Sequence, residues 1–496
     1  MRCAGLRGAG LSCGTPPPAK GKYVRRTRKA VLITLSMLDV FTLAAGITVA
    51  RMLPPRLAAL RVPVAADRPV VRAAPVLPAE TDPPTLPSRD GLSAALGPAL
   101  RGSEVGADLG VVVADAATGR QLYAENPGTL ATPASTTKVV TAVTTLAVLG
   151  PDARFTTSVR QASGGIVLVG GGDPTLAVNR YPSSDYPQPA TLASLAASTA
   201  RALKAEGRRS VRLGYDTSLY SGPTMAPGWT SSDVSTGNVT PIVSLEVDQG
   251  RLTASGSPQD SDDPVNFSPR TTNPAGMAAS AFASLLRQDG ITLSGGPSPQ
   301  TAPAGAATLA SVSSPPLSEI VGQMLRESNN VIAENLGRHL ALAMGMPASF
   351  SGAAAAVTAE LRRLGVRTPI SLVDTSGLSP QDGIAPDTLV SVLEVALNVA
   401  RVRAAITGLP VAGFTGTLSA GQSIFGGIGG AARGVVRAKT GNLTTVATLA
   451  GLAYDRSGTL LVFAIMAPQV PGAAMLQTAA DAIDSAAGAL ADCGCR

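Results

Sequence analysis

Three short motifs, far apart in the chain, constrain this sequence more than any other feature. They are Ser135-Thr136-Thr137-Lys138, Ser328-Asn329-Asn330 and Lys439-Thr440-Gly441. Each motif is common by chance in a long chain, but their order and local contexts together indicate one shared site. The sequence has a single histidine, His339, so a serine at this site would be activated by lysine instead of imidazole. A Ser-His-Asp site would have to use His339, because the chain offers no other imidazole.

The segment around Ser135 predicts the start of a helix. Pro133 precedes it, and apolar residues follow at helical spacing from Val139 onward. Positions three apart share a helix face, so Lys138 is predicted to lie beside Ser135. Burial and a neighbouring cation such as Lys439 would keep Lys138 neutral for part of the time, as a general base requires.

The second motif interrupts a helical stretch and suits the proton transfers of acyl transfer to serine. Ser328 would relay a proton and help to position Lys138. Asn330 would offer its amide to Lys138 and to the substrate backbone. We therefore treat Ser328 and Asn330 as catalytic candidates.

The third motif lies at the end of a predicted strand. Lys439 and Thr440 would present a cation and a hydroxyl group to a substrate carboxylate. Gly441 has no side chain and would let the chain approach closely there. Ser135 would add a backbone N–H at a helix N-terminus, where the helix dipole favours negative charge.

Composition permits a large core and two or more domains. The chain has 496 residues, of which 45% are hydrophobic and 3% aromatic, so the core must depend on aliphatic packing. The net charge of +7 does not indicate nucleic-acid binding, because the basic excess is concentrated near the N-terminus and no aromatic residues alternate with it. That basic cluster comprises Lys20, Lys22, Arg25, Arg26, Arg28 and Lys29.

Cysteine and histidine usage argues against a metal site. The four cysteines are Cys3, Cys13, Cys493 and Cys495, so no disulfide framework or cysteine-based zinc site organises the fold. Whether Cys493 and Cys495 pair is left open by the sequence. One histidine cannot form the HExxH motif of zinc peptidases. We predict no metal and no cofactor.

The N-terminal region predicts a membrane anchor. Residues 1–29 form a basic cytoplasmic tail, and residues 30–50 form an apolar run of about the 20 residues that a spanning helix needs. The positive-inside rule then places the rest of the chain outside the cytoplasm, with the proline-rich residues 51–88 as a tether. The alternative is a cleaved signal peptide and a secreted protein.

The folded part predicts a discontinuous α/β domain. Residues 89–155 contain a β-hairpin and the helix that begins near Ser135, and residues 313–490 contain helices followed by three strands. Residues 156–312 have a different sequence pattern, with short strand-like segments between glycine- and proline-rich loops. We interpret 156–312 as an insertion.

At these motifs the chain resembles the class C low-molecular-mass penicillin-binding proteins, the D-alanyl-D-alanine carboxypeptidase/endopeptidase family. The resemblance implies a penicillin-binding/β-lactamase-like transpeptidase domain, an α+β sandwich, with an inserted and mainly β domain before the Ser-x-Asn motif. Further matching segments are Gly170-Gly171-Gly172-Asp173-Pro174-Thr175-Leu176, Asp216-Thr217-Ser218-Leu219-Tyr220, Pro227-Gly228-Trp229 and Asp374-Thr375-Ser376-Gly377-Leu378-Ser379.

This resemblance implies a serine peptidase of the cell wall. Ser135 would attack the D-Ala-D-Ala bond of peptidoglycan stem peptides and form an acyl-enzyme, and β-lactams would acylate the same serine. The alternatives are a β-lactamase of the same fold and a catalytically weak cell-wall binding scaffold. The sequence does not separate carboxypeptidase from endopeptidase activity.

One residue departs from the family pattern. The position after Lys-Thr-Gly is often Thr or Ser in these enzymes, and here it is Asn442. The resemblance implies that the backbone N–H groups of Asn442 and Ser135 form the oxyanion hole, which the change of side chain leaves intact. The side-chain contact to the substrate carboxylate is what the departure calls into question.

Overall fold

The computed structural model describes residues 86–182, 186–252, 268–419, 421 and 423–495, which belong to one compact unit, 82–496. The predicted tail 1–29, the predicted anchor 30–50 and nearly all of the predicted tether 51–88 lie outside the described residues. Within the described ranges, no helix is both long enough and apolar enough to cross a membrane.

A five-stranded antiparallel sheet, in the order β11-β12-β13-β1-β2, joins the two ends of the folded chain. Strand β1 pairs with β13, and Gly110 lies opposite Met466. The structure therefore confirms the hairpin and the three C-terminal strands that the sequence predicted. The strands are β1 (Gly110–Asp115), β2 (Gln121–Glu125), β11 (Val436–Leu443), β12 (Val446–Tyr454) and β13 (Leu460–Ala467).

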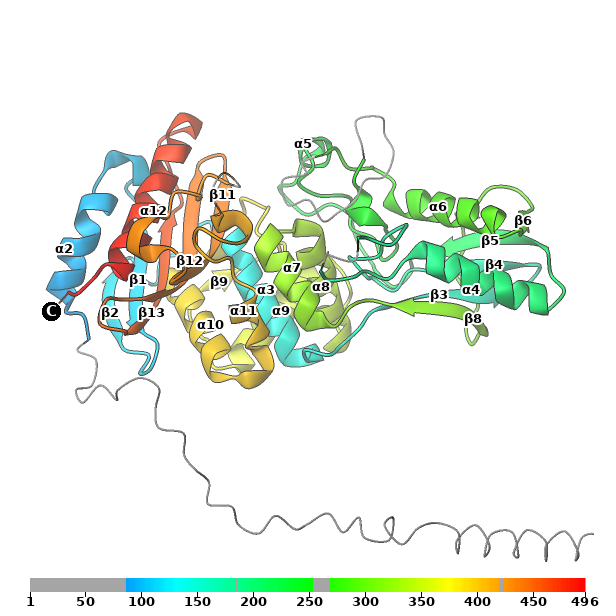
Figure 1. Ribbon diagram of the computed structural model, residues 1–496, viewed down its shortest axis with the longest axis horizontal. Coiled ribbons are helices and arrows are strands. Elements are labelled where there is room, and N and C mark those ends of the chain that lie inside the picture. The colour runs from blue at the N-terminus through cyan, green and yellow to red at the C-terminus, as the bar shows by residue number, and fades with distance from the viewer. Residues whose placement is uncertain (1–85, 183–185, 253–267, 420, 422, 496) are drawn as a thin grey trace, which may run out of the picture. The chain divides into compact units, whose positions relative to one another are not determined.

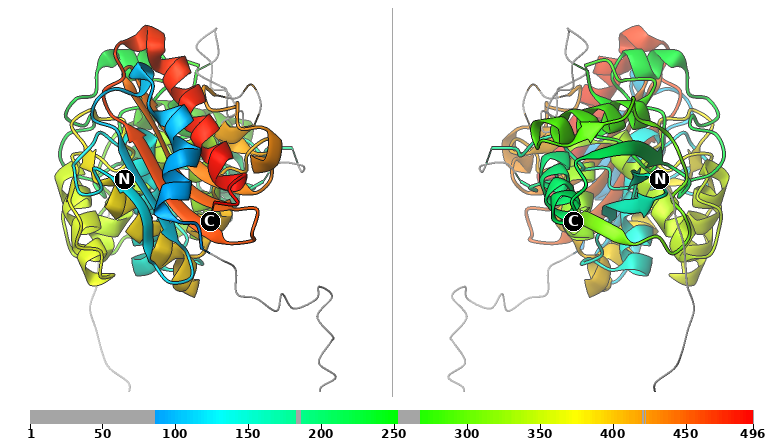
Figure 2. Two further views of the ribbon diagram at one scale, coloured as in Figure 1. Left: turned by 90° about the vertical axis from the view of Figure 1, so that its left-hand side faces the viewer. Right: turned by 90° about the vertical axis from the view of Figure 1, so that its right-hand side faces the viewer.

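Helices cover both faces of this sheet because its strands are apolar on both sides. Val111 and Val113 of β1 pack in one core with α2 and α12, while Val112 and Ala114 pack in the other core with α3 and its neighbours. Helices α2 and α12 lie side by side on the first face (Figures 1 and 2). The covering helices are α2 (Arg89–Leu100), α3 (Thr137–Leu149), α7 (Leu317–Glu327), α8 (Asn330–Ala343), α9 (Phe350–Arg363), α10 (Pro386–Asn398), α11 (Ala404–Thr407) and α12 (Leu476–Ala491).

A second sheet is formed entirely by strands between Thr156 and Ser313, in the order β6-β5-β4-β3-β8, with β7 also paired to β5. Strand β5 runs parallel to β4, β6 and β7. The elements are β3 (Thr156–Ala162), β4 (Gly165–Val169), α4 (Leu192–Ala205), β5 (Ser210–Asp216), α5 (Ser231–Ser235), α6 (Pro274–Gln288), β6 (Thr292–Leu293), β7 (Ser298–Pro299) and β8 (Thr308–Ser313). Figure 1 shows α4 and α6 beside this sheet.

The region 156–312 contains more helix than the mainly β domain that the sequence predicted. Helix α4 has 14 residues and α6 has 15, and both pack on the sheet in a separate apolar core. The Thr191 side chain caps α4 by accepting a hydrogen bond from the backbone N–H of Ser194. Leu192 and Leu195 then bury one face of the helix. Both segments are rich in alanine, the strongest helix former, but the sequence analysis did not separate them from the surrounding glycine- and proline-rich loops.

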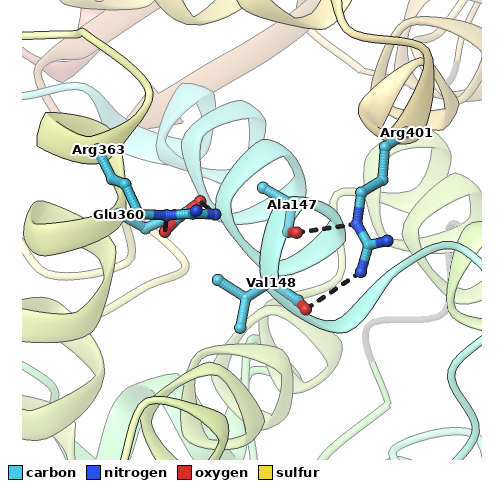
Figure 3. Close-up of polar contacts among 5 residues, drawn as sticks. All are labelled: Ala147, Val148, Glu360, Arg363 and Arg401. Atoms are coloured by element: carbon cyan, nitrogen blue, oxygen red, sulfur yellow. Dashed lines mark hydrogen bonds and ion pairs between the residues drawn. The ribbon is translucent and has the colours of Figure 1, made fainter.

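Helix α3 packs in the core on the second face of the first sheet, and its C-terminal end is held by Arg401. Its C-terminal carbonyl groups face Arg401, whose Nε donates to Ala147 O (2.9 Å) and whose Nη2 donates to Val148 O (3.3 Å; Figure 3). A cation at a helix C-terminus complements the helix dipole. On neighbouring α9, Glu360 pairs with Arg363 one turn away (Figure 3). Helix α3 therefore provides a fixed base for the residues at its N-terminus.

Two smaller features complete the described fold. The short antiparallel pair β9 (Ile370–Ser371) and β10 (Gly383–Ile384) brackets the loop 372–382. Near the C-terminus, Cys493 and Cys495 form a disulfide, and Cys493 is buried in the core beside α2 and α12. This disulfide belongs to the packing of the first sheet.

Candidate active site

Ser135 lies in a tight turn directly before α3. The turn is a single 3-10 turn, Ala134–Thr136, and Ala134 has a φ of +47°, a left-handed conformation that is unfavourable for a residue with a Cβ. Thr137 Oγ1 donates to Ala134 O (2.9 Å), which stabilises the turn. A Cβ on Gly377 would collide with the same carbonyl group, so only glycine fits there. The strained turn is therefore enforced by its surroundings.

Lys138 lies one turn further on and is fully buried. Its Nζ donates to Ser135 Oγ (2.8 Å), to Asn330 Oδ1 (2.6 Å) and to the backbone oxygen of Ser376 (2.8 Å). Burial lowers the pKa of Lys138 to about 7, although nearby carboxylates oppose that shift. A neutral amine in this position directs a lone pair at the Ser135 hydroxyl group, so Lys138 can act as a base near neutral pH.

Three buried carboxyl groups lie around Lys138, and the sequence analysis did not predict them. Asp374 accepts hydrogen bonds from the backbone N–H groups of Ser376 (2.9 Å) and Gly377 (2.7 Å), so it shapes the loop whose carbonyl holds Lys138. Burial, reinforced by the charge of Asp374, raises the pKa of Glu334 to about 7 and that of Asp382 to about 10. The Asp-x-Ser-Gly pattern of the loop was the available turn signal.

Ser328 contacts a different lysine from the one that the sequence predicted. It ends α7 with a left-handed backbone (φ 56°, ψ 36°) at the junction with α8. Its Oγ accepts a hydrogen bond from Lys439 Nζ (2.8 Å), whereas the prediction placed it against Lys138. Lys439 lies on β11, is fully buried and also donates to Thr440 O (2.8 Å). Burial and the charge of Lys138 hold the pKa of Lys439 well below its ordinary value.

The Ser-x-Asn motif is connected to the region 156–312. Asn330 Nδ2 donates to the backbone oxygen of Asn238 (2.9 Å), which occupies one of its two amide hydrogens. Asn329 caps α8 and donates to Gln249 Oε1 (2.5 Å). The Asn330 amide, which was predicted to meet the substrate, therefore also joins α8 to the region 156–312.

Strand β11 brings the third motif, Lys439-Thr440-Gly441, against the turn Ala134–Thr136 that carries Ser135. A Cβ on Gly441 would lie 3.0 Å from the backbone nitrogen of Ser135, so the absence of a side chain permits the close approach. Thr448 Oγ1 on β12 donates to Pro133 O (2.8 Å) and ties the turn to the sheet. Thr440 is buried, while Asn442, two residues along on the same face, is exposed.

A cavity of about 180 Å³ joins these groups, with Lys138 and Lys439 buried behind it. The charged groups in its lining are Arg251 and Arg270 from the region 156–312 and Glu327, which directly precedes Ser328 and whose pKa burial raises to about 7. The predicted site residues in its lining are Ser135, Ser328, Asn330, Thr440 and Asn442, and Thr417 joins them without having been predicted.

His339 has a structural environment. Its ring stacks on Phe155 at 3.8 Å, and Nε2 lies 2.9 Å from Gly172 O. Burial lowers its pKa to about 4, so the ring is neutral at pH 7. None of these contacts is with the Ser135 hydroxyl group. Among the residues that the structure describes, no cluster of three or more His, Cys, Asp or Glu side chains could hold a metal ion.

A sequence profile of the D-Ala-D-Ala carboxypeptidase 3 (S13) family matches residues 92–268 and 247–490. The chain belongs to this family. Carboxypeptidase DacB of Mycolicibacterium smegmatis is 38% identical over 85% of this chain and 88% of its own length. The D-alanyl-D-alanine carboxypeptidase of Actinomadura sp. is 29% identical over 72% of this chain and 77% of its own length.

A solved structure agrees with the fold. Penicillin-binding protein 4 of Haemophilus influenzae superposes with a TM-score of 0.64, at 23% identity, over 80% of this chain and 98% of the other. The family and the α/β fold predicted from the motifs are therefore confirmed. As a member of the D-Ala-D-Ala carboxypeptidase 3 (S13) family, the chain is a peptidase, a hydrolase with D-Ala-D-Ala carboxypeptidase function.

Proposed function

We propose that this chain cleaves the D-Ala-D-Ala bond of peptidoglycan stem peptides through an acyl-enzyme on Ser135, as a carboxypeptidase, an endopeptidase or both. One observation carries the proposal: Lys138 Nζ lies 2.8 Å from Ser135 Oγ in a fully buried position where its pKa is about 7. A lysine with an ordinary pKa would be protonated at neutral pH and could not accept the serine proton. Burial thus gives this serine a base without histidine.

Acylation follows from the geometry. Lys138 accepts the hydroxyl proton of Ser135 as Oγ bonds to the carbonyl carbon of the penultimate D-alanine. The resulting oxyanion is stabilised by the backbone N–H groups of Ser135 and Asn442. When the C–N bond breaks, the leaving amine takes the proton that Lys138 accepted from Ser135, with the Ser328 hydroxyl group, which is hydrogen-bonded to Lys439, as the relay, and Lys138 is neutral again. The released amino acid departs, and the peptide remains as an ester on Ser135.

Deacylation uses the same base. Water attacks the ester carbonyl carbon and gives a proton to neutral Lys138, and Lys138 returns that proton to Ser135 Oγ as the ester bond breaks, which restores the hydroxyl group. Asn330, which accepts a hydrogen bond from Lys138 Nζ, holds the amine in place through both steps. Each cycle consumes one water and needs no cofactor.

β-Lactams should acylate the same serine because their strained amide presents a carbonyl group to Oγ. Penicillin-binding protein 4 of Haemophilus influenzae has also been solved in complex with a β-lactam, and that structure is 22% identical to this chain. A β-lactamase of the same fold would release the opened lactam rapidly, whereas a peptidase would retain it. The continuous hydrogen bonding from Ser135 to Lys138 and Asn330 favours a working enzyme over a binding scaffold.

We propose further that residues 30–50 anchor the chain in the cell membrane and that 51–88 tether the catalytic body outside it. The length and apolarity of the run and the preceding basic residues 1–29 support this arrangement. The division of the folded part into 89–155, 156–312 and 313–490 belongs to the same proposal. Deleting 1–50 should move the protein from the membrane fraction to the soluble fraction, and unchanged fractionation would contradict the anchor.

The activity is tested with purified muropeptides. The full chain is incubated separately with uncross-linked pentapeptides and with cross-linked dimers, and the products are identified by mass spectrometry. Release of D-alanine from pentapeptides shows carboxypeptidase activity, and conversion of dimers to monomers shows endopeptidase activity. Ser135→Ala should abolish both reactions. If the wild type cleaved neither substrate, or if Ser135→Ala cleaved them equally well, the proposed function would be wrong.

A further inference from the structure

A loop outside the three motifs covers the open edge of the first sheet beside Lys-Thr-Gly. Strand β11 is an edge strand, and residues 410–412 run along it through hydrogen bonds from Ala412 N to Val436 O and from Ala438 N to Pro410 O. The chain then turns back toward the catalytic cavity. This edge pairing fixes where the following residues lie relative to β11.

The same loop also packs closely against the end of α7. Gly416 has a φ of +58°, and a Cβ there would lie 2.5 Å from the backbone oxygen of Arg326. Ser423 Oγ donates to the backbone oxygen of Thr417 (2.6 Å). Thr417 is thus held on two sides, by the α7 terminus and by Ser423, and its position does not depend on its own side chain.

The Thr417 hydroxyl group lies 2.8 Å from that of Thr440, and both residues line the cavity that contains Ser135. Each hydroxyl group has one hydrogen to donate. When one donates to the other, a single hydrogen is left for a ligand. When an anion enters, both can turn toward it, and two donors at this spacing can face the two oxygens of one carboxylate.

Lys439, the buried lysine next to Thr440, favours the binding of an anion by the hydroxyl groups of Thr417 and Thr440. Lys439 is fully buried, and its hydrogen bonds go to a hydroxyl group, Ser328 Oγ, and to a backbone oxygen, Thr440 O. None of the ion pairs within the described ranges involves Lys439. A carboxylate beside Thr440 would supply the missing opposite charge. Asn442, in contrast, is exposed on the same face of β11 and offers an amide where relatives often have a hydroxyl group.

We propose that Thr417 and Thr440 together bind the C-terminal carboxylate of the substrate, with Thr417 supplying the hydroxyl group that position 442 lacks. Thr417 is then a specificity-determining residue for peptides that end in a free carboxylate. This inference rests on the proposed function, because it assigns a subsite to the same reaction.

The test compares two peptide substrates, one ending in D-Ala-D-Ala with a free carboxylate and one ending in D-Ala-D-alaninamide. Steady-state kinetics are measured for the wild type and for Thr417→Val, which keeps the shape of the side chain and removes its hydroxyl group. A hydrogen bond to a charged group is worth a factor of about 10 or more in affinity. We expect kcat/KM for the carboxylate substrate to fall by about that factor, mainly through KM, while the amide substrate changes little.

Three further variants separate recognition from loop structure. Thr417→Ser keeps a hydroxyl group and should retain the preference for the carboxylate. Thr415→Val removes another hydroxyl group of the loop, one that accepts a hydrogen bond from Val411 N, and should also retain the preference. The double variant Thr417→Val/Asn442→Thr should recover most of the lost preference.

Two results would overturn the inference. In the first, Thr417→Val lowers kcat/KM equally for both substrates, which indicates a structural role. In the second, it leaves the ratio of the two substrates unchanged. Failure of the proposed function is distinguishable, because the wild type would then cleave neither peptide.

Discussion

Lys138 and Lys439 are both fully buried in the same site, yet their surroundings differ in one respect. Lys138 lies near three carboxyl groups, whose charges raise its pKa and partly offset the effect of burial. Lys439 has a hydroxyl group and a backbone oxygen as partners, and both burial and the charge of Lys138 lower its pKa. The charges around Lys138 therefore oppose the effect of burial on its pKa, whereas the charge near Lys439 adds to that effect.

This difference assigns a role to each lysine. Burial, partly offset by the nearby carboxyl groups, brings the pKa of Lys138 to about 7, where it can gain and lose a proton during turnover. Lys439 lacks such a counter-charge, and an anionic substrate beside it would favour its charged form, which then serves in binding. One lysine is poised for proton transfer and the other for recognition.

The largest expected effect on activity comes from replacing Lys138. Lys138→Met keeps an apolar stem in the buried site but eliminates the base, so kcat for peptide hydrolysis should fall by about 1,000-fold or more. Steady-state assays of D-alanine release measure the loss. Lys204→Met, on the exposed surface of α4, is the control and should retain full activity. Activity of Lys138→Met within about tenfold of the wild type would contradict the role of Lys138 as base.

A large effect is also expected at Gly377, which leaves room for the turn Ala134–Thr136 that carries Ser135. Gly377→Ala places a Cβ against Ala134 O and should displace Ser135, which costs about 100-fold in kcat/KM for a misplacement near 1 Å. Gly458→Ala is a matched control, since its φ of +79° is close to the +78° of Gly377 but its Cβ meets no atom within 4 Å. The control should lose about 1–2 kcal/mol of stability and no activity. Equal kinetic effects of the two variants would show that backbone strain, and not the collision, is responsible.

An intermediate effect should appear in the pH dependence. Protonation of Lys138 removes the base, so kcat/KM should fall as the pH drops below about 7. Glu334, whose own pKa is about 7, is partly ionised in this range and raises the pKa of Lys138, so Glu334→Gln should move the acid limb to lower pH. The amide can be accommodated because the single hydrogen of Thr375 Oγ1, which reaches either Glu334 Oε2 or Ala333 O, can go to Ala333 O, and the hydroxyl oxygen can then accept a hydrogen bond from the introduced amide.

The control for this titration is Glu360→Gln on α9, where the carboxylate pairs with Arg363 (Figure 3). It should leave the acid limb in place. A limb that moved to higher pH in Glu334→Gln, or that moved equally in both variants, would contradict the electrostatic account of Lys138.

The smallest effect is expected at the only histidine. His339 is neutral at pH 7 and packs against Phe155, so His339→Gln should cost about 1 kcal/mol of stability and leave the pH profile unchanged. Thermal unfolding and pH–rate measurements check both expectations. A large loss of kcat without a loss of stability would instead support imidazole as the base.

The sequence predicted the parts of the site whose signals are local. The helix that carries Lys138, the hairpin and the C-terminal strands follow from residue spacing over a few turns, and the structure confirms them. The family was identified from the order of the motifs and was confirmed by comparison. Each helix, strand and motif behind these inferences is a run of residues that are near one another in the chain, and the family needed only the order of the three motifs in addition.

The features that were missed depend on contacts between distant segments. Ser328 was assigned to Lys138, but the turn at the end of α7 directs its Oγ to Lys439, 111 residues away. Asp374 and Thr417 act through a loop and an edge segment whose places in space no local pattern specifies. Helices α4 and α6 were not predicted because the surrounding glycine- and proline-rich loops led to the interpretation of 156–312 as mainly β.

The central claim is that Ser135 is the nucleophile, and it is tested most directly by labelling with penicillin. The purified full chain is incubated with a labelled penicillin, and the intact mass and the digested peptides are analysed by mass spectrometry. We expect one adduct per chain, located on Ser135, and no adduct on Ser135→Ala. An adduct on another residue, or active wild-type peptidase that is never labelled, would contradict the account.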